Sequence, residues 1–108
     1  MKLMTAVIPC YNSAAYMSRA IESLLAGGDE MEIIIVNDGS TDKTQEIAEE
    51  YQRRYPNIVR VISQENGGHG EAVNTGLANA TGLYFKVVDS DDWVSEKALL
   101  QVMATLKE

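Results

Sequence analysis

The sequence alternates four times between a short apolar run and a segment whose apolar residues recur every three or four positions. The apolar runs cover residues 3–9, 32–38, 58–64 and 83–89 and are rich in valine, isoleucine and aromatic side chains. Such runs are typical of strands buried on both faces of a parallel sheet, each followed by a helix. We therefore predict an α/β fold with an open, mostly parallel sheet of about four strands.

Helical spacing covers residues 16–25, 47–55, 72–80 and 98–106. Ser95 is the predicted N-cap of the last helix, and Asp42 is interpreted as a cap of the second helix rather than a ligand. Right-handed crossovers allow a simple progression of strands or a reversal, with helices on both faces. The reversed order, 3-2-1-4, opens a ligand crevice between strands one and four, outside the carboxyl ends of the strands.

Length and charge limit the classes of function. The 108 residues suffice for a single domain with one core, residues 1–108. A formal net charge of −7 argues against binding to a phosphate backbone, so we expect no nucleic acid partner. No apolar run reaches about 20 residues, so no transmembrane segment is expected. The single cysteine, Cys10, indicates a reducing compartment, so we expect a cytoplasmic protein, which includes one peripheral to the inner face of the membrane.

The turn after the first run, residues 9–13, lacks the glycines of a dinucleotide-binding GxGxxG motif, and the chain contains no GxxxxGK[ST] phosphate loop. The two commonest nucleotide signatures of α/β folds are therefore excluded. Tyr11 is available to stack on a base. The alternative is a plain strand-to-helix turn with Cys10 buried as a small hydrophobe.

Polar segments follow the second and third runs. Asp38 stands where a ribose-binding or base-binding carboxylate sits in nucleotide folds, although Asp-Gly also forms ordinary turns. The glycine-rich segment 66–70 lets backbone approach a ligand, and the helix that it opens favours an anion at its N-terminus. Within it, His69 is interpreted as a solvated loop residue, with a direct role as ligand or base as the alternative.

The strongest chemical signal is the acidic segment Asp89-Ser90-Asp91-Asp92, directly after an apolar run of buried type, residues 84–88. Three carboxylates at the mouth of a sheet repel one another unless a cation or a proton offsets their charge. Hard carboxylate oxygens suit Mg²⁺ or Mn²⁺, which bind through one or two carboxylates together with substrate phosphates. The alternative is an acidic loop at the start of a helix, pinned to the core by Trp93.

Four motifs occur in the order and spacing of a known family: VIPCYN at 7–12, VNDGSTD at 36–42, NGGHGEAVNTGL at 66–77 and DSDD at 89–92. The chain resembles the N-terminal, donor-binding half of the family 2 glycosyltransferases of the GT-A type, and the resemblance covers essentially all 108 residues. The resemblance implies a Rossmann-like GT-A fold. It also implies a transferase that moves a sugar from a nucleoside-diphosphate sugar, a UDP-sugar by expectation, to an acceptor hydroxyl.

By this resemblance, the nucleotide-sugar-binding residues are Pro9, Tyr11, Asn12, Asp38, Gly68, Asn74 and Asp89. Asp91 and Asp92 are the implied ligands of a Mg or Mn divalent cation, and their division of labour stays open. Two positions depart from the family pattern: Asn37 replaces a common aspartate, and Val73 replaces a common arginine. The departure at Val73 leaves the identity of the base open.

The family's transfer proceeds mostly with inversion, and its general base is an aspartate on a later segment. Here that base would lie beyond Glu108, and the remaining acids, Glu96 and Glu108, are poor substitutes because they fall on or beyond the last predicted helix. We therefore expect a domain truncated before the acceptor-binding half, one that binds donor but transfers no sugar. We also expect homo-oligomers through the surfaces that truncation exposes.

Two competing functions remain from the sequence. One is a phosphotransferase or phosphatase with an aspartate nucleophile, which α/β folds usually place after the first strand, where this chain has Cys10 and Tyr11. The other is a non-catalytic module that binds a nucleotide or a partner protein.

Overall fold

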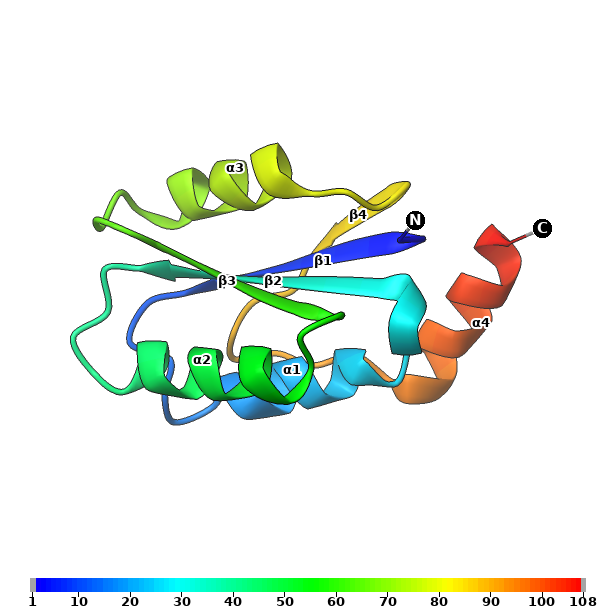
Figure 1. Ribbon diagram of the computed structural model, residues 1–108, viewed down its shortest axis with the longest axis horizontal. Coiled ribbons are helices and arrows are strands. Elements are labelled where there is room, and N and C mark those ends of the chain that lie inside the picture. The colour runs from blue at the N-terminus through cyan, green and yellow to red at the C-terminus, as the bar shows by residue number, and fades with distance from the viewer. Residues whose placement is uncertain (1, 108) are drawn as a thin grey trace.

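The structure, a computed structural model, describes residues 2–107 and confirms the predicted α/β architecture (Figure 1). The strands are β1 (Met4–Cys10), β2 (Met31–Asp38), β3 (Val59–Gln64) and β4 (Tyr84–Val87). The helices are α1 (Met17–Leu25), α2 (Thr44–Arg54), α3 (His69–Asn79) and α4 (Glu96–Leu106), with a short 3₁₀ helix, η1 (Gly28–Glu30), before β2. The largest difference from the predicted strands is at β4, which ends at Val87 instead of Asp89.

Within residues 2–107 the strands form one sheet in the order β3-β2-β1-β4, and all pairs are parallel. This is the predicted reversal. Met4 of β1 pairs with Met31 of β2 on one side and with Tyr84 of β4 on the other. Because the chain leaves β1 toward β2 and returns on the opposite side as β4, a crevice opens at the carboxyl end of β1.

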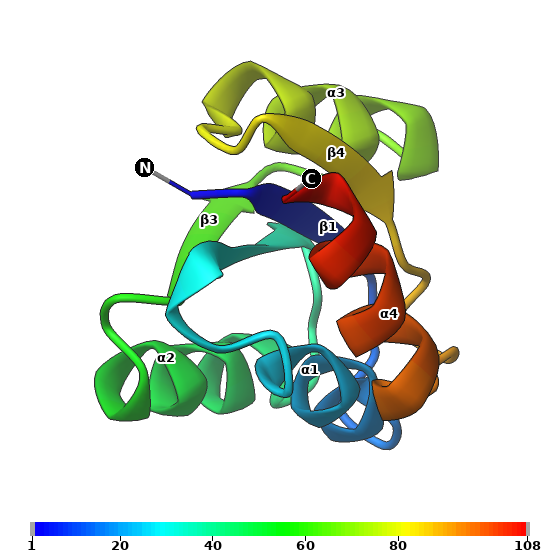
Figure 2. The same cartoon turned by 90° about the vertical axis from the view of Figure 1, so that its right-hand side faces the viewer.

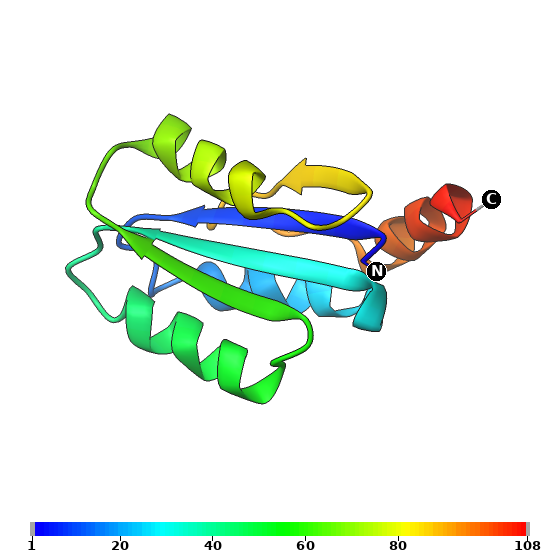
Figure 3. The ribbon, with the colours of Figure 1, turned by 45° about the horizontal axis from the view of Figure 1, so that its top comes forward.

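Helices cover both faces of the sheet, as predicted. Figure 1 shows α1 and α2 beneath the sheet and α3 above it, and Figure 3 shows β3 and β4 at the two edges of the twisted sheet. Figure 2 shows α4 beside α1, where its buried residues Leu99 and Met103 join the core. None of the helices within residues 2–107 is long and apolar enough to cross a membrane.

The core is built on the central strands β1 and β2, in which every residue is buried. Its larger part packs against α1 and α2, and a smaller cluster, which includes Val7 and Ala72, packs under α3. Helix α3 approaches closely because Gly76 has no side chain: a Cβ there would lie 2.4 Å from Cγ1 of Val7. This contact holds α3 against β1.

Strand β4 departs from the expectation of a strand buried on both faces. All its residues are exposed, including Tyr84 and Phe85, and burial resumes only at Val88. The physical reason is position: β4 is an edge strand that pairs with β1 on one side and, among residues 2–107, with no strand on the other. An apolar strand is buried on both faces only where helices or other strands pack against it.

One of the two predicted caps is in place. Ser95 Oγ accepts a hydrogen bond of 3.3 Å from the backbone N–H of Ala98, at the first turn of α4. Asp42 accepts from the backbone N–H of Thr44 at 2.9 Å and from that of Ala14 at 3.1 Å. The N-cap residue of α2 is Lys43, which makes no side-chain cap hydrogen bond, so the prediction that Asp42 caps this helix is off by one residue. From the position before the cap, Asp42 supports the first residue of α2 and ties it to the loop after β1.

Candidate functional site

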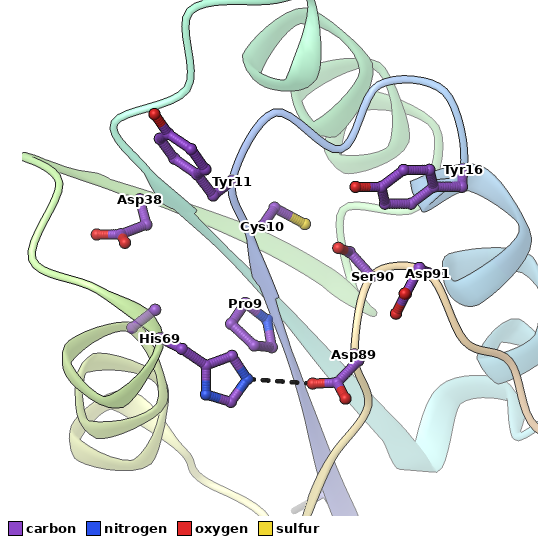
Figure 4. A pocket seen from close by; sticks show the side chains of 10 residues that line it. Pro9, Cys10, Tyr11, Tyr16, Asp38, His69, Asp89, Ser90 and Asp91 are labelled. Atoms are coloured by element: carbon purple, nitrogen blue, oxygen red, sulfur yellow. Dashed lines mark hydrogen bonds and ion pairs between the residues drawn. The ribbon is translucent and has the colours of Figure 1, made fainter.

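A cavity of about 300 Å³ opens at the carboxyl ends of β1 and β2, beside the loop that follows β4 (Figure 4). It lies at the crevice expected from the strand order. The residues that line it are Pro9, Cys10, Tyr11, Tyr16, Asp38, His69, Ala72, Asp89, Ser90 and Asp91. The fold thus brings together five of the predicted site residues: Pro9, Tyr11, Asp38, Asp89 and Asp91.

Asp38 ends β2 and is buried. One carboxylate oxygen, Oδ1, accepts from Gly67 N at 2.8 Å and from Gln64 Nε2 at 2.9 Å, and Oδ2 accepts from Gly68 N at 2.9 Å. Burial raises the pKa of this carboxyl, but the three donors outweigh it, so the pKa of Asp38 lies below its ordinary value. Asp38 is therefore an ionised group that holds the glycine loop and faces the cavity.

His69 and Asp89 meet at the mouth of the cavity. His69 Nε2 lies 3.1 Å from Asp89 Oδ1, so the first residue of α3 contacts the loop after β4 (Figure 4). Sequence reasoning favoured a solvated loop residue at position 69. The predicted topology could have placed His69 at the site, because the first turn of a helix that follows a parallel strand lies at the ligand-binding edge of the sheet.

The acidic loop is attached to α1 and to the loop that precedes it by contacts that the sequence did not predict. Ser90 Oγ lies 2.7 Å from Ser13 Oγ. The guanidinium of Arg19 lies 3.4 Å above the centre of the Trp93 ring, and the backbone N–H of Val94 donates to Ser23 Oγ at 3.1 Å. The alternative interpretation of this segment had Trp93 pin the loop to the core, but Trp93 is 48% exposed and packs against an arginine instead.

The turn after β1 combines an exposed and a buried side chain. Tyr11 is 54% exposed and lines the cavity, where its ring is available to a flat ligand. Cys10 is buried, and that burial raises the pKa of its thiol to about 12. A thiol with this pKa supplies no thiolate near neutral pH, so Cys10 acts as the small hydrophobe of the alternative interpretation.

Four predicted site residues do not line the cavity: Asn12, Gly68, Asn74 and Asp92. Asn12, at φ 48°, crosslinks two loops, since its N–H donates to Ser40 Oγ and its Oδ1 accepts from Thr41 N. Gly68, at φ 94°, shapes the loop that Asp38 holds. Asn74 is exposed on α3. Asp92 Oδ1 accepts the backbone N–H of Trp93 at 2.8 Å.

The lining residues missed by sequence reasoning are Tyr16, Ala72 and Ser90. Ala72 was assigned to the apolar face of the third helix. Tyr16 was assigned to the apolar face of the first helix, yet it precedes α1 and is 43% exposed. Ser90 lies inside the DSDD motif between two acids. Its position between two predicted site residues was the available signal, because a short loop bends and consecutive side chains in it can line one cavity.

The side-chain oxygens of the acidic loop are suitable ligands for a hard divalent cation. Asp89 and Asp91 both line the cavity and offer carboxylate oxygens, whereas Asp92 points its Oδ1 at its own loop backbone. Within residues 2–107 no group of three or more His, Cys, Asp or Glu side chains is arranged as a complete metal site. A Mg²⁺ or Mn²⁺ ion at this loop would therefore need oxygen ligands from substrate as well.

A parallel sheet with reversed strand order and a polar cavity at the reversal places the chain among the α/β domains that bind ligands at a topological switch point. The family model for glycosyl transferase family 2 matches residues 5–108, and the chain belongs to this family. Its fold is that of the GT-A glycosyltransferases.

Known relatives agree with this assignment. The chain is 46% identical over 94 residues to the uncharacterized glycosyltransferase EpsJ of Bacillus subtilis, a match covering 86% of this chain and 27% of that protein. Residues 1–349 of S. aureus TarS in complex with UDP superpose with a TM-score of 0.85 at 32% identity, covering 99% of this chain and 32% of that chain. The chain therefore spans about a third or less of the length of these proteins.

A third solved structure is more distant. Glucosyl-3-phosphoglycerate synthase from Mycobacterium tuberculosis, in complex with Mn²⁺, UDP and glucosyl-3-phosphoglycerate, superposes with a TM-score of 0.62 at 28% identity. The match covers 82% of this chain and 33% of that chain.

Proposed function

We propose that residues 1–108 form the nucleotide-sugar-binding domain of a metal-dependent, inverting glycosyltransferase, with a UDP-sugar as donor. The observation that carries the proposal is the cavity at the strand reversal, with Asp38 on one side and the acidic loop of Asp89 and Asp91 on the other. The UDP complexes of TarS and of glucosyl-3-phosphoglycerate synthase support a uridine nucleotide as ligand.

The cavity separates the two ends of such a donor. Tyr11 presents an aromatic face at the end of β1 for the base, and Asp38 holds the neighbouring glycine loop in shape while offering a negative edge. Asp89 and Asp91 lie at the other side, where ribose hydroxyls and the diphosphate would reach. In this assignment Asp38 has two roles: it contacts the base directly, and it holds the glycine loop in the shape that borders the cavity.

Asp91 is our assignment for the principal cation ligand, with Asp89 beside it. A bound Mg²⁺ or Mn²⁺ would offset the charge of the departing diphosphate. The Mn²⁺ in the complex of glucosyl-3-phosphoglycerate synthase supports a divalent cation at this site. Asp92 was predicted from the family resemblance as a second ligand, and we now propose that it shapes the loop, because its Oδ1 accepts a backbone N–H.

The acceptor's proton needs a general base that these residues do not offer. Among the described residues, Asp38, Asp89 and Asp91 are the carboxylates that line the cavity, and all three are assigned to the donor. Glu96 is exposed at the start of α4, outside the cavity. We therefore propose that residues 1–108 alone bind donor without transferring sugar.

A calorimetric titration of UDP into the protein with Mn²⁺, with Mg²⁺ and with chelator tests the proposal. We expect binding that requires the cation and that is lost in Asp91→Asn. Glu96→Gln, an exposed acid outside the cavity, is the matched control and should bind as the unaltered protein does. Equal binding in chelator would remove the cation from the proposal, and absence of UDP binding in every condition would remove the nucleotide.

A non-catalytic nucleotide-binding module is the second candidate, because the carboxylates that line the cavity among the described residues are all assigned to the donor. Turnover separates the two. Slow release of sugar from UDP-sugar in the presence of Mn²⁺, abolished by Asp91→Asn, would support an enzyme domain, whereas binding without any hydrolysis would support the module.

Self-association and location complete the proposal. The exposed apolar edge of β4, with Tyr84, Phe85 and Val87, supports the expected homo-oligomer. Light scattering at rising concentration should show a mass above that of one chain, and a constant single-chain mass would contradict it. We propose that the protein is located in the cytoplasm or bound peripherally to the inner face of the membrane. Cell fractionation would test this location.

A further inference from the structure

The cavity that we assign to the donor is poor in positive charge. Asp38, Asp89 and Asp91 supply three carboxylates, and among the described residues that line it there is neither lysine nor arginine. Of the lining residues within 2–107, His69 alone carries a basic side chain. A diphosphate carries negative charge into this setting, so each hydrogen-bond donor available to phosphate oxygens has a large share in the affinity.

Asp38 fixes the backbone that leads into His69. The preceding residues Gly67 and Gly68 donate their N–H groups to the carboxylate of Asp38, and Gly68 has φ 94°, a conformation that favours glycine. Position 69 then opens α3, which Gly76 keeps close to β1. The direction in which the imidazole leaves the backbone is therefore set by Asp38 and by the packing of the helix.

The imidazole ring of His69 is oriented by Asp89, across the cavity from Asp38 (Figure 4). Its Nε2 lies 3.1 Å from Asp89 Oδ1, and Figure 4 shows the ring extended from α3 toward Asp89 beneath Pro9. The two side chains are 65% and 59% exposed. A pair this exposed adds little to stability, so its consequence is orientation, and its geometry can rearrange readily when a ligand arrives.

We propose that His69 is a specificity-determining residue of the donor site, one that donates a hydrogen bond to a phosphate oxygen of a bound nucleoside diphosphate. Asp89 orients the imidazole through the contact at His69 Nε2, and it is free to contact the ligand once a phosphate oxygen accepts from His69 instead. His69 then makes affinity depend on the diphosphate rather than on the nucleoside. This inference rests on the proposed function.

The test compares UDP with uridine, because uridine lacks every phosphate oxygen. NMR chemical-shift titrations in the presence of Mg²⁺ measure dissociation constants for both ligands, including millimolar ones. For His69→Ala we expect about tenfold weaker UDP binding, the loss of one charge-assisted hydrogen bond, and uridine binding unchanged within about twofold. His69→Gln, whose amide keeps an N–H donor, should recover most of the affinity for UDP.

Glu71→Gln is the matched control, an exposed side chain in the same first turn of α3 that does not line the cavity. It should leave both ligands unaffected. Unchanged UDP binding in His69→Ala, or equal weakening of UDP and uridine, would overturn the inference while leaving the proposed function intact. If the unaltered protein fails to bind UDP, the proposed function fails and this inference with it.

Discussion

The hydroxyls of Ser13 and Ser90, 77 positions apart in the chain, lie 2.7 Å apart and join the loop after β1 to the acidic loop after β4. Ser13 is fully buried, and its Oγ also accepts the backbone N–H of Tyr11 at 3.2 Å. The two loops that border the cavity are therefore one unit. The position of Asp89 and Asp91 depends on the start of α1 as well as on β4.

Replacing Ser90 with alanine tests this coupling. Ser13 keeps the backbone oxygen of Tyr11 as a partner, so we expect stability to fall by only about 0.5–1 kcal/mol, whereas UDP affinity should fall more than this loss explains. Urea unfolding and UDP titration measure the two quantities. Thr105→Ala removes an exposed hydroxyl on α4 and serves as control. UDP affinity equal to that of the control would mean that the contact does not position the loop.

Glu32 provides a prediction on pH. This buried carboxylate accepts from Thr5 Oγ1 at 2.8 Å and Thr81 N at 2.9 Å, and pairs with Arg60 Nη1 at 3.0 Å. Burial raises the pKa of Glu32, but these hydrogen bonds outweigh it and hold the pKa below its ordinary value. The Glu32 contribution to stability is thus complete above the pKa of an unfolded glutamate, and it is lost as the pH falls through the lower folded pKa.

For Glu32→Gln we expect a loss of about 1–3 kcal/mol at pH 7, because buried donors lose a charged acceptor. The loss should shrink as the pH is lowered past the ordinary glutamate range, since protonation removes the same charge from the unaltered protein. Urea midpoints between pH 7 and pH 3 measure this. The exposed residue Glu49, altered to glutamine, is the control. A pH-independent difference between the unaltered protein and the Glu32 variant would contradict the assignment.

Gly76 and Gly70 form a matched pair on α3. An alanine Cβ at Gly76 would lie 2.4 Å and 2.6 Å from the two methyl groups of Val7, whereas one at Gly70 meets nothing within 4 Å. We expect Gly76→Ala to cost about 1–3 kcal/mol through overpacking. Gly70→Ala should be neutral or stabilising by up to about 1 kcal/mol, because alanine is the better helix former. Thermal unfolding of both variants decides the matter, and equal effects would argue against close packing of α3 on β1.

Cys10 should resist thiol reagents in the folded protein. Its burial and its pKa of about 12 leave almost no accessible thiolate at pH 8. Ellman's reagent should therefore react at the rate of unfolding, and rapidly in concentrated urea. Fast reaction with the native protein, at the rate of a free thiol, would show that the turn after β1 opens readily.

Much of the fold followed from local pattern. The run Ile33 to Val36 predicted a central buried strand, and β2 is buried throughout. The acids Asp38, Asp89 and Asp91 were expected near one another because carboxyl ends of parallel strands share one edge of a sheet, and all three line the cavity. Their individual roles in binding stay predictions.

Other features depended on which neighbours the fold supplies. The run 84–88 has the composition of a buried strand, but β4 lies at an edge and its side chains are exposed. The alternative interpretation of the acidic loop placed Trp93 against the core, whereas Trp93 stacks with Arg19 on α1. Asn12 and Asp92 matched binding motifs, yet their oxygens accept hydrogen bonds from nearby loop backbone.

The sequence by itself determined the family, the parallel α/β class and the edge of the sheet that carries the chemistry, because periodicity and motif spacing are local properties of the chain. Only the tertiary structure decided that His69 meets Asp89, that Ser13 meets Ser90 and that both oxygens of Asp38 hold the glycine loop. These pairs are separated by 20 or more positions. Side chains that far apart come within hydrogen-bond distance only after the strand order and helix packing are set.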